Sequence, residues 1–515
     1  MVIKTGAFRV RGFIMALFFL PSIVFFGNTA LAFESPFYTD LGQMNYARFL
    51  MHGGEYRTAA REFERVIESF PGSPVLVEAQ FGLSEAYYMA GLYDKAEVQY
   101  RQFVRNFGES PLAGKALVRL DELGWMRVKR LPTIPLPEAP FRQVKGLKAV
   151  QVMLFEGRTI EEVEGELKGL GSAGVDTVIL RVFHNSGDRF YRFVSPRDKR
   201  GVYFNTSSAP VVDDMLSAVL TAAHRQGLKV FAWMTTRYAD YGVEDDEDLA
   251  CTGYDIRSKG FVRCKGLDLF NERAIERLER IYADLAEYEI DGVLFQDDLV
   301  LRHSEGFGAH MEALFKKETG VEMDPESLYL RTDGQSVHYT ELFWKWASWK
   351  NRRLLDVAGR LKEVVAKKRP EARFAINLMY ESVTNAPYAL AWLSQDLAEA
   401  ARRDFDYYSI MAYHRQMGTE LKRDPEEIRD IIERMVVDAS ASVGPEKVLI
   451  KVQTIDWSSG EALPDDEVAG ILKSVRAKES VSLAVVPYRK DLPLKELAGG
   501  GSGADAAATS KEEGI

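Results

Sequence analysis

The sequence predicts an α/β protein: a (β/α)8 TIM-like barrel preceded by an all-α domain of helical repeats. Two observations carry this prediction. Residues 36–125 repeat at a fixed interval of 37 positions, and eight strand-like runs alternate with amphipathic helices over residues 145–497. Eight strand–helix alternations over a segment of this length are typical of a (β/α)8 barrel.

The first 32 residues have the form of a secretory signal peptide. Lys4, Arg9 and Arg11 precede the apolar run FIMALFFLPSIVFF, and residues 30–32 (ALA) form a small-residue cleavage site. Pro21 inside the run disfavours a permanent membrane span, and no later segment is long and apolar enough to cross a bilayer. We therefore expect an exported protein, periplasmic or secreted, without a membrane span after signal cleavage.

The segment at 36–128 is predicted to form tetratricopeptide-like repeats. Matching side chains recur 37 positions apart in two helical segments, GEYRTAAREFERVIESFPGSP and GLYDKAEVQYRQFVRNFGESP. The matching pairs are Tyr56 and Tyr93, Ala59 and Ala96, Phe63 and Tyr100, Phe70 and Phe107, and Pro74 and Pro111. The aromatic positions favour helix packing over a ligand site. A short solenoid of this kind usually binds a protein partner, whose identity the repeats do not reveal.

Two segments are expected to lack a packed core. Residues 129–144 carry four prolines and predict a stiff linker, and residues 498–515 form a low-complexity tail that we expect to be disordered. The barrel is therefore placed at 145–497. Its candidate strands are LKAVQVML, DTVILRVF, KVFAWMTT, GVLFQDD, RFAINLMYE, YYSIMAYH, KVLIKVQTID and SLAVVPYR.

The net charge of the chain is −10, and removal of the three signal-peptide cations makes it −13. This balance argues against nucleic acid as a partner and suits a neutral or cationic ligand. The two cysteines, Cys251 and Cys264, lie close together in an exported chain, which favours a disulfide. Further ligands for a metal are missing nearby, so neither a metal nor a cofactor is expected.

Polar and aromatic residues gather where the predicted strands end, which is where a (β/α)8 barrel carries its active site. A surface turn would explain one such end, whereas six strands show the pattern. The residues are Arg181, His184, Trp233, Asp297, Asp298, Tyr380, Glu381, Tyr413, His414, Gln453 and Asp456, with Trp457 following.

Strand alternation suggests which carboxylates face the lumen. In VLFQDD, Leu294, Gln296 and Asp298 share one face, so Asp298 is predicted to point inward and Asp297 to orient its neighbours. The same counting places Glu381 inward after its strand. Paired carboxylates with aromatic platforms are what glycoside hydrolysis requires: one group protonates the leaving oxygen while the other acts as base or nucleophile. No GxSxG or HExxH motif supports another hydrolase chemistry.

The runs KVFAWM, IDGVLFQDD, DYYSIMAY and VQTIDW resemble, in this order, the C-terminal glycoside hydrolase domain of the poly-β-1,6-N-acetylglucosamine deacetylase family of PgaB. The likeness covers residues 145–495. It implies a barrel that cleaves partially deacetylated poly-N-acetylglucosamine internally, with Asp297 and Asp298 in the active groove. It also implies a further acid shortly downstream, for which Glu305 is the candidate.

The sequence departs from that family in two ways. The deacetylase domain with its metal-binding Asp and two His is absent, and helical repeats stand in its place. A Glu expected after the sixth strand is replaced by the region MAYHRQMGTEL, where only Glu420 is nearby. Three interpretations stay open: an exported glycoside hydrolase, a non-catalytic polysaccharide-binding protein on the same scaffold, and an assembly scaffold that uses only its repeats.

Overall fold

The computed structural model describes residues 39–129, 146–332, 336–478, 480–492, 494 and 497. The predicted signal peptide, the linker from residue 130 and the C-terminal tail lie outside these residues. Within the described ranges, no helix has the length and apolar character needed to span a membrane.

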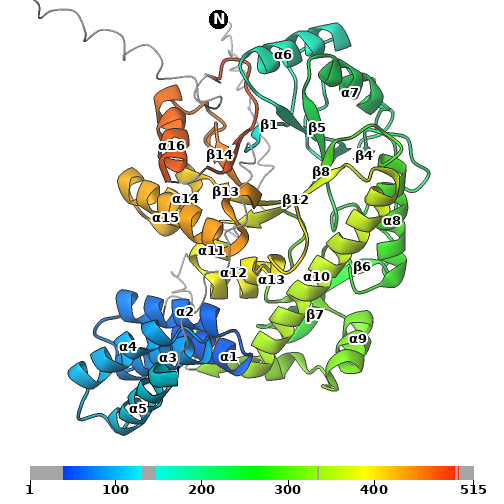
Figure 1. Cartoon of the computed structure of the whole chain (residues 1–515). Coiled ribbons are helices and arrows are strands. Elements are labelled where there is room, and N and C mark those ends of the chain that lie inside the picture. The colour runs from blue at the N-terminus through cyan, green and yellow to red at the C-terminus, as the bar shows by residue number, and fades with distance from the viewer. Residues whose placement is uncertain are drawn as a thin grey trace, which may run out of the picture.

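Eight parallel strands close into a barrel, as the sequence predicted (Figure 1). Each strand pairs with the next one in the chain, and the last pairs with the first. The barrel strands are β1 (Lys148–Val152), β2 (Thr177–Arg181), β5 (Lys229–Met234), β8 (Gly292–Phe295), β12 (Arg373–Met379), β13 (Tyr407–Ala412), β14 (Val448–Gln453) and β15 (Ser482–Val486).

Helices follow the strands and cover the outside of the barrel (Figure 1). They are α6 (Ile160–Ser172), α7 (Leu216–Arg225), α8 (Glu272–Leu285), α10 (Glu341–Lys368), α11 (Glu381–Thr384), α12 (Ala386–Leu393), α13 (Leu397–Ala400), α14 (His414–Leu421), α15 (Pro425–Val443) and α16 (Asp465–Lys478). Local sequence sets their starts. At α15, for example, Asp424 and Glu427 form a capping box, and Pro425 occupies the first turn, where its missing N–H is not needed.

The register of the strands shows which side chains fill the lumen. Phe295 stacks on Tyr282 of α8 with ring centroids 5.9 Å apart, so it faces outward and its neighbour Leu294 faces inward. Leu294 aligns with Trp233 of β5, which in turn aligns with Arg181 of β2. The same reasoning places further side chains inward near the carboxyl ends of the strands: Gln151, Asn377, Met379, Met411, Lys451, Gln453 and Val486.

Several strand–helix connections carry additional strands and helices at the mouth of the barrel. These are β3 (Phe183–His184) and β4 (Gly201–Val202) after β2, β6 (Ala250–Asp255) and β7 (Gly260–Leu267) after β5, and β9 (Glu305–Phe307), α9 (Ala309–Thr319), β10 (Tyr329–Thr332) and β11 (Ser336–Tyr339) after β8. β6, β7 and β9 form one small sheet.

Residues 39–129 of the N-terminal domain form five helices: α1 (Asp40–His52), α2 (Tyr56–Ser69), α3 (Leu76–Met89), α4 (Tyr93–Asn106) and α5 (Ala113–Lys129). Four of the recurring aromatic and alanine positions lie in its core: Ala59, Phe63, Ala96 and Tyr100 are at most 2% exposed. The sequence interpretation of these positions as helix packing is therefore confirmed.

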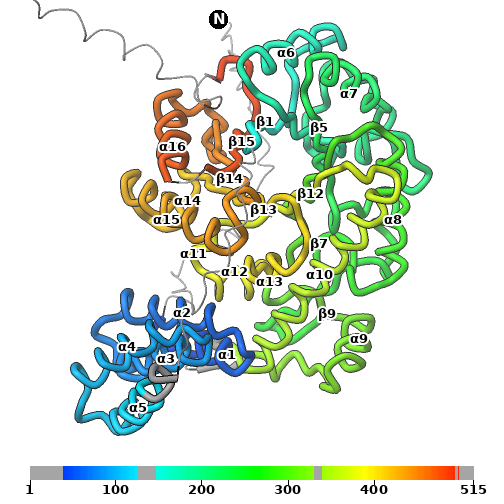
Figure 2. Tube along the Cα trace, viewed as in Figure 1, coloured from blue at the N-terminus to red at the C-terminus, as the bar shows by residue number. Residues whose placement is uncertain are grey.

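The repeats pack directly on the barrel domain (Figure 2). Tyr46 of α1 contacts Trp344 in the first turn of α10, with ring centroids 5.2 Å apart. The Nη2 atom of Arg65 donates to the carbonyl of Val383 at 2.8 Å, which ties α2 to the end of α11. Glu55 forms an ion pair with Arg402 near α13.

Candidate active site

The carboxylate of Asp298 is fully engaged by the loop that follows β5. Thr235 Oγ1 donates to its Oδ2 at 2.6 Å, and Thr236 Oγ1 donates to its Oδ1 at 2.7 Å. The backbone N–H groups of Thr236 and Tyr238 donate to Oδ2 at 2.9 and 2.8 Å. Asp298 is 1% exposed, so it anchors this loop and its oxygens are already occupied.

This arrangement corrects the assignment that strand alternation suggested for the two aspartates. The strand β8 ends at Phe295, and the chain turns at residues 297 and 298, so alternation does not extend to them. Asp298 holds the neighbouring loop, which is the role predicted for Asp297. Asp297, in contrast, lies near side chains of the barrel lumen.

Asp297 lies beside the buried ammonium of Lys451, which projects inward from β14. Burial raises the pKa of Asp297 to about 6, while Lys451 opposes this rise and the neighbouring Asp298 adds to it. Burial also lowers the pKa of Lys451 to about 8, against the effect of Asp297. Lys451 Nζ donates to Asn377 Oδ1 at 3.2 Å. Between about pH 6 and 8, therefore, an ionised carboxylate faces an ammonium at the mouth.

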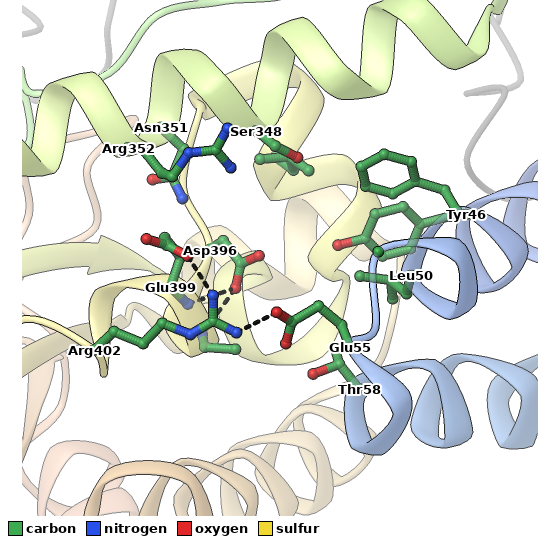
Figure 3. A pocket seen from close by; sticks show the side chains of 14 residues that line it. Tyr46, Leu50, Glu55, Thr58, Ser348, Asn351, Arg352, Asp396, Glu399 and Arg402 are labelled. Carbon is green, nitrogen blue, oxygen red and sulfur yellow. Dashed lines mark hydrogen bonds and ion pairs between the residues drawn. The ribbon is translucent and has the colours of Figure 1, made fainter. Parts of the chain in front are cut away.

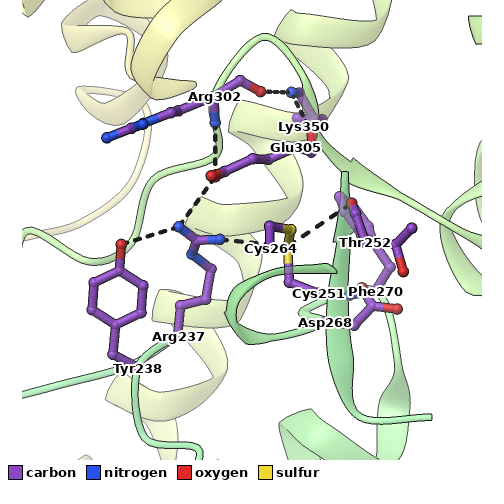
Figure 4. Close-up of a disulfide and its surroundings, with 10 residues drawn as sticks. All are labelled: Arg237, Tyr238, Cys251, Thr252, Cys264, Asp268, Phe270, Arg302, Glu305 and Lys350. Atoms are coloured by element: carbon purple, nitrogen blue, oxygen red, sulfur yellow. Dashed lines mark hydrogen bonds and ion pairs between the residues drawn. A yellow bond between two sulfur atoms is a disulfide. The ribbon is translucent and has the colours of Figure 1, made fainter. Parts of the chain in front are cut away.

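Glu305 lies on the same connection after β8, next to a buried guanidinium (Figure 4). Its Oε2 is 3.2 Å from Arg237 Nη2 and accepts from the N–H of Arg302 at 3.2 Å. Both contacts use Oε2, so Oε1 is the oxygen that remains for a substrate. Arg237 is only 1% exposed, and its Nη1 lies 3.5 Å from Sγ of Cys251.

Cys251 and Cys264 form a disulfide between β6 and β7 (Figure 4). The bond joins the two strands of the hairpin that follows β5. Because Arg237 contacts Cys251, the disulfide supports the side chain that holds Glu305.

Glu381 occupies a separate place at the start of α11. Burial, followed by the nearby Glu420, raises the pKa of Glu381 to about 8. Its Oε2 is buried without a hydrogen-bond partner, while the hydroxyl of Tyr380 donates to Glu420 at 2.9 Å. The pKa of Glu381 responds to Glu420, whereas that of Asp297 responds to Lys451, Asp298 and Lys265. Glu381 and Asp297 thus respond to different neighbouring charges.

Arg181 and His184 are held by internal contacts after β2. Arg181 Nη1 forms an ion pair with Asp188 at 3.0 Å, and its Nη2 donates to the carbonyl of Arg189 at 2.8 Å. The ring of His184 stacks on Phe190 with centroids 3.9 Å apart. Burial lowers the pKa of His184 to about 4, so its imidazole is neutral at physiological pH. Both residues shape the mouth from within.

Three further predicted binding residues have structural contacts. Trp233 is 0% exposed, because it fills the lumen, and so it is no platform for a sugar. The Oε1 of Gln453 accepts from the N–H of Arg415 at 3.0 Å, which caps α14. Asp456 accepts from the N–H of Ser458 at 2.8 Å in a turn.

Tyr413 and Trp457 do come together at the mouth. Their ring centroids are 5.6 Å apart, and Tyr413 clusters with Met411 and Val486. Asp297 contributes to raising the pKa of Tyr413, after burial. His414 begins α14 beside them and contacts Glu467 at 2.8 Å. An apolar, partly aromatic wall thus lies next to Asp297, as a sugar ring would require.

Both domains match known protein families. Residues 167–484 match the profile of the hypothetical glycosyl hydrolase family 13, which is more than half of the chain. The chain belongs to this family. Residues 42–73 and 78–110 match the tetratricopeptide repeat, so this chain carries tetratricopeptide repeats on the N-terminal side of the barrel. No curated protein matches the sequence at a significant level.

Solved structures resemble this barrel in fold. The glycoside hydrolase domain of PgaB (BpsB) from Bordetella bronchiseptica is 20% identical with a TM-score of 0.52, over 69% of this chain and 96% of that one. The catalytic domain of β-amylase from Paenibacillus polymyxa is 11% identical with a TM-score of 0.46, over 68% and 95%. At this level of identity the first of these supports the fold and the resemblance noted in the sequence.

Sequence reasoning missed Lys451 as a candidate site residue. Lys451 is 1% exposed and is the one basic residue inside the apolar strand VLIKVQ. A lysine in the middle of a buried strand is a signal that could have found it, because such a charge needs a partner. Within the described ranges, no three His, Cys, Asp or Glu side chains gather in a way that could hold a metal ion.

Proposed function

We propose that this protein is an exported glycoside hydrolase. It acts on an amino-sugar exopolysaccharide such as partially deacetylated poly-β-1,6-N-acetylglucosamine. The observation that carries the proposal is Asp297: a half-buried carboxylate at the barrel mouth, balanced by Lys451, beside the apolar wall of Tyr413 and Trp457. The polymer class is the one implied by the sequence resemblance to the PgaB family, and the fold similarity to the PgaB glycoside hydrolase domain supports that choice. The N-terminal signal sequence and the disulfide support export to an oxidising compartment.

Asp297 has the protonation state that hydrolysis near neutral pH needs from a base or nucleophile. With a pKa of about 6 it is mostly ionised at pH 7, and it can oppose the positive charge of an oxocarbenium-like transition state. An ionised carboxylate also attracts the ammonium of a deacetylated glucosamine unit. Glu305 is the second carboxyl on the same connection, and its Oε1 is the candidate to serve the leaving oxygen.

The test is a reducing-end assay on partially deacetylated poly-β-1,6-N-acetylglucosamine with the mature protein and Asp297→Asn. We expect the variant to lose at least about 100-fold in kcat/KM, since a positioned acid or base typically supplies 10²–10⁴-fold. The matched control is Asp404→Asn, because Asp404 is 92% exposed and lies before β13, at the opposite end of the barrel. Equal activity of Asp297→Asn and wild type would refute the assignment.

A second function, non-catalytic binding of the same polymer, is favoured by one observation. Two of the other predicted acids are engaged, since Asp298 is occupied by hydrogen bonds and Glu305 is held by Arg237, which leaves fewer carboxylates for the acid and base roles that hydrolysis needs. In that case wild type releases no reducing ends, and Asp297→Asn weakens polymer binding. The repeats are proposed in either case to dock a protein of polymer synthesis or export.

A further inference from the structure

A cavity lies in the seam between the repeats and the barrel domain (Figure 3). Its interior volume is about 140 Å³, below the range of about 300–1,000 Å³ typical of drug-sized ligands, so it can hold one small ligand. Tyr46, Leu50, Glu55 and Thr58 line it from α1 and α2. Ser348, Asn351, Asp396 and Arg402 line it from the barrel side. Interfaces between domains are preferred places for such sites.

The hydroxyl of Tyr46 points into this cavity without a hydrogen-bond partner (Figure 3). Tyr46 is 0% exposed, and its ring is fixed by Trp344 at 5.2 Å and by Phe49 at 6.2 Å between centroids. A buried tyrosine hydroxyl normally finds a partner, because leaving it unpaired costs stability. Its orientation toward the cavity therefore indicates a group that binds there.

The charges of the lining show what kind of group fits. Arg402 is already neutralised by Glu55 and, at 2.8 Å, by Glu399. Asp396 lies within electrostatic range of Arg402 but forms no direct ion pair among the described residues; its Oδ1 accepts from the N–H groups of Ala398 and Glu399. Asp396 and Tyr46 line the cavity from opposite sides of the seam (Figure 3). A carboxylate without a direct ion pair and a hydroxyl without a hydrogen-bond partner fit a ligand that donates hydrogen bonds and carries positive charge.

We propose that this seam binds a small hydroxylated cation, with the ammonium at Asp396 and a hydroxyl at Tyr46. The choice of protonated glucosamine as that cation rests on the proposed function, which makes this sugar part of the polymer. The buried amide of Asn351 and the hydroxyls of Ser348 and Thr58 supply further hydrogen bonds. Because the ligand contacts both domains, its binding also strengthens the docking of the repeats on the barrel.

The experiment measures binding of glucosamine, glucose and N-acetylglucosamine to the mature protein by ligand-detected NMR and calorimetry. All variants are made in the Asp297→Asn background, which removes the carboxylate at the barrel mouth. We expect glucosamine to bind, and the two uncharged sugars to bind at least tenfold more weakly. Tyr46→Phe and Asp396→Asn should each weaken glucosamine binding about tenfold or more. Asn at 396 keeps the oxygen that caps α13 and removes only the charge.

The matched control is Tyr56→Phe, which removes a tyrosine hydroxyl from α2 outside the cavity lining and should leave binding unchanged. Tyr46→Phe should also leave the melting temperature unchanged or higher, because it deletes an unpaired buried hydroxyl. A lower melting temperature with unchanged glucosamine binding would assign Tyr46 a purely structural role and overturn the proposal.

Two other outcomes separate this inference from the proposed function. If glucosamine binds wild type but not the Asp297→Asn background, its site is the barrel mouth, and the seam proposal fails while the proposed function gains support. If glucose binds the seam as well as glucosamine does, the cation requirement is wrong. Seam binding of glucosamine with no effect of Asp297→Asn on polymer cleavage would leave the seam site in place and refute the proposed function.

Discussion

Asp297 and Glu381 both follow barrel strands, and burial raises the pKa of each, yet their neighbours are opposite. Asp297 has the ammonium of Lys451 beside it, and its pKa is about 6. Glu381 has the carboxylate of Glu420 beside it, and its pKa is about 8. At pH 7 the first is mostly an anion and the second mostly a neutral acid. The neighbouring charge thus sets the protonation state of each carboxyl group, and of the two only Asp297 is negatively charged at neutral pH.

The comparison depends first on Asp298, which fixes the turn that carries Asp297. We expect Asp298→Asn to lower the free energy of unfolding by about 2–4 kcal/mol, because an amide NH₂ cannot accept the hydrogen bonds that Thr235, Thr236 and Tyr238 donate. Urea denaturation measures this loss. The adjacent Asp297→Asn is the matched control and should lower stability by less than Asp298→Asn, since it leaves those bonds intact. Equal stabilities of the two variants would contradict the anchoring role.

The Glu381 half of the comparison is tested by stability against pH. The unfolded chain ionises Glu381 near its ordinary value of 4.5, whereas the folded protein holds the proton up to about pH 8. Wild type therefore loses stability as pH rises from about 4.5 to 8, and the loss then levels off. Glu381→Gln removes this term, so its stability relative to wild type should be higher at pH 8 than at pH 5 in urea titrations.

Glu420→Gln provides the matching control for the Glu381 measurement. It removes the like charge but keeps an oxygen that accepts from Tyr380, so the pKa of Glu381 should fall below about 8. The pH at which stability levels off should fall with it, and the change should be smaller than that of Glu381→Gln. A pH profile that neither substitution alters would show that Glu381 is ionised like an ordinary surface glutamate.

The smallest effect is expected from Lys451→Met on the acidic limb of activity. Lys451 lowers the pKa of Asp297, so its removal should raise that pKa above about 6. If the ionised carboxylate is the active form, kcat/KM at pH 6 should fall several-fold, up to about tenfold, while kcat/KM at pH 8 changes less. The pH profile of polymer cleavage measures this. Lys473→Met, at an exposed position of α16, is the control. An unshifted acidic limb would show that Lys451 does not act on Asp297.

Much of the fold could be predicted from the sequence, because its helices and strands follow from local periodicity. The 37-residue interval predicted the helical repeats, and all eight strand-like runs contain barrel strands. Alternation also placed Leu294 and Arg181 inward correctly, since both lie inside regular strands. It did not extend to Asp297 and Asp298, because strand geometry ends at Phe295 and a turn has no fixed alternation.

What only the tertiary structure decided is which charges meet. Lys451 is 154 residues from Asp297 along the chain, and Arg237 is 68 residues from Glu305, so no local pattern reveals either contact. The packing of the repeats on the barrel was likewise invisible, because the prolines suggested only a spacer. The sequence determined by itself that there would be repeats, a barrel and carboxylates after its strands. The burial and the opposing charge that set the state of each carboxylate come from barrel closure, which brings distant strands side by side.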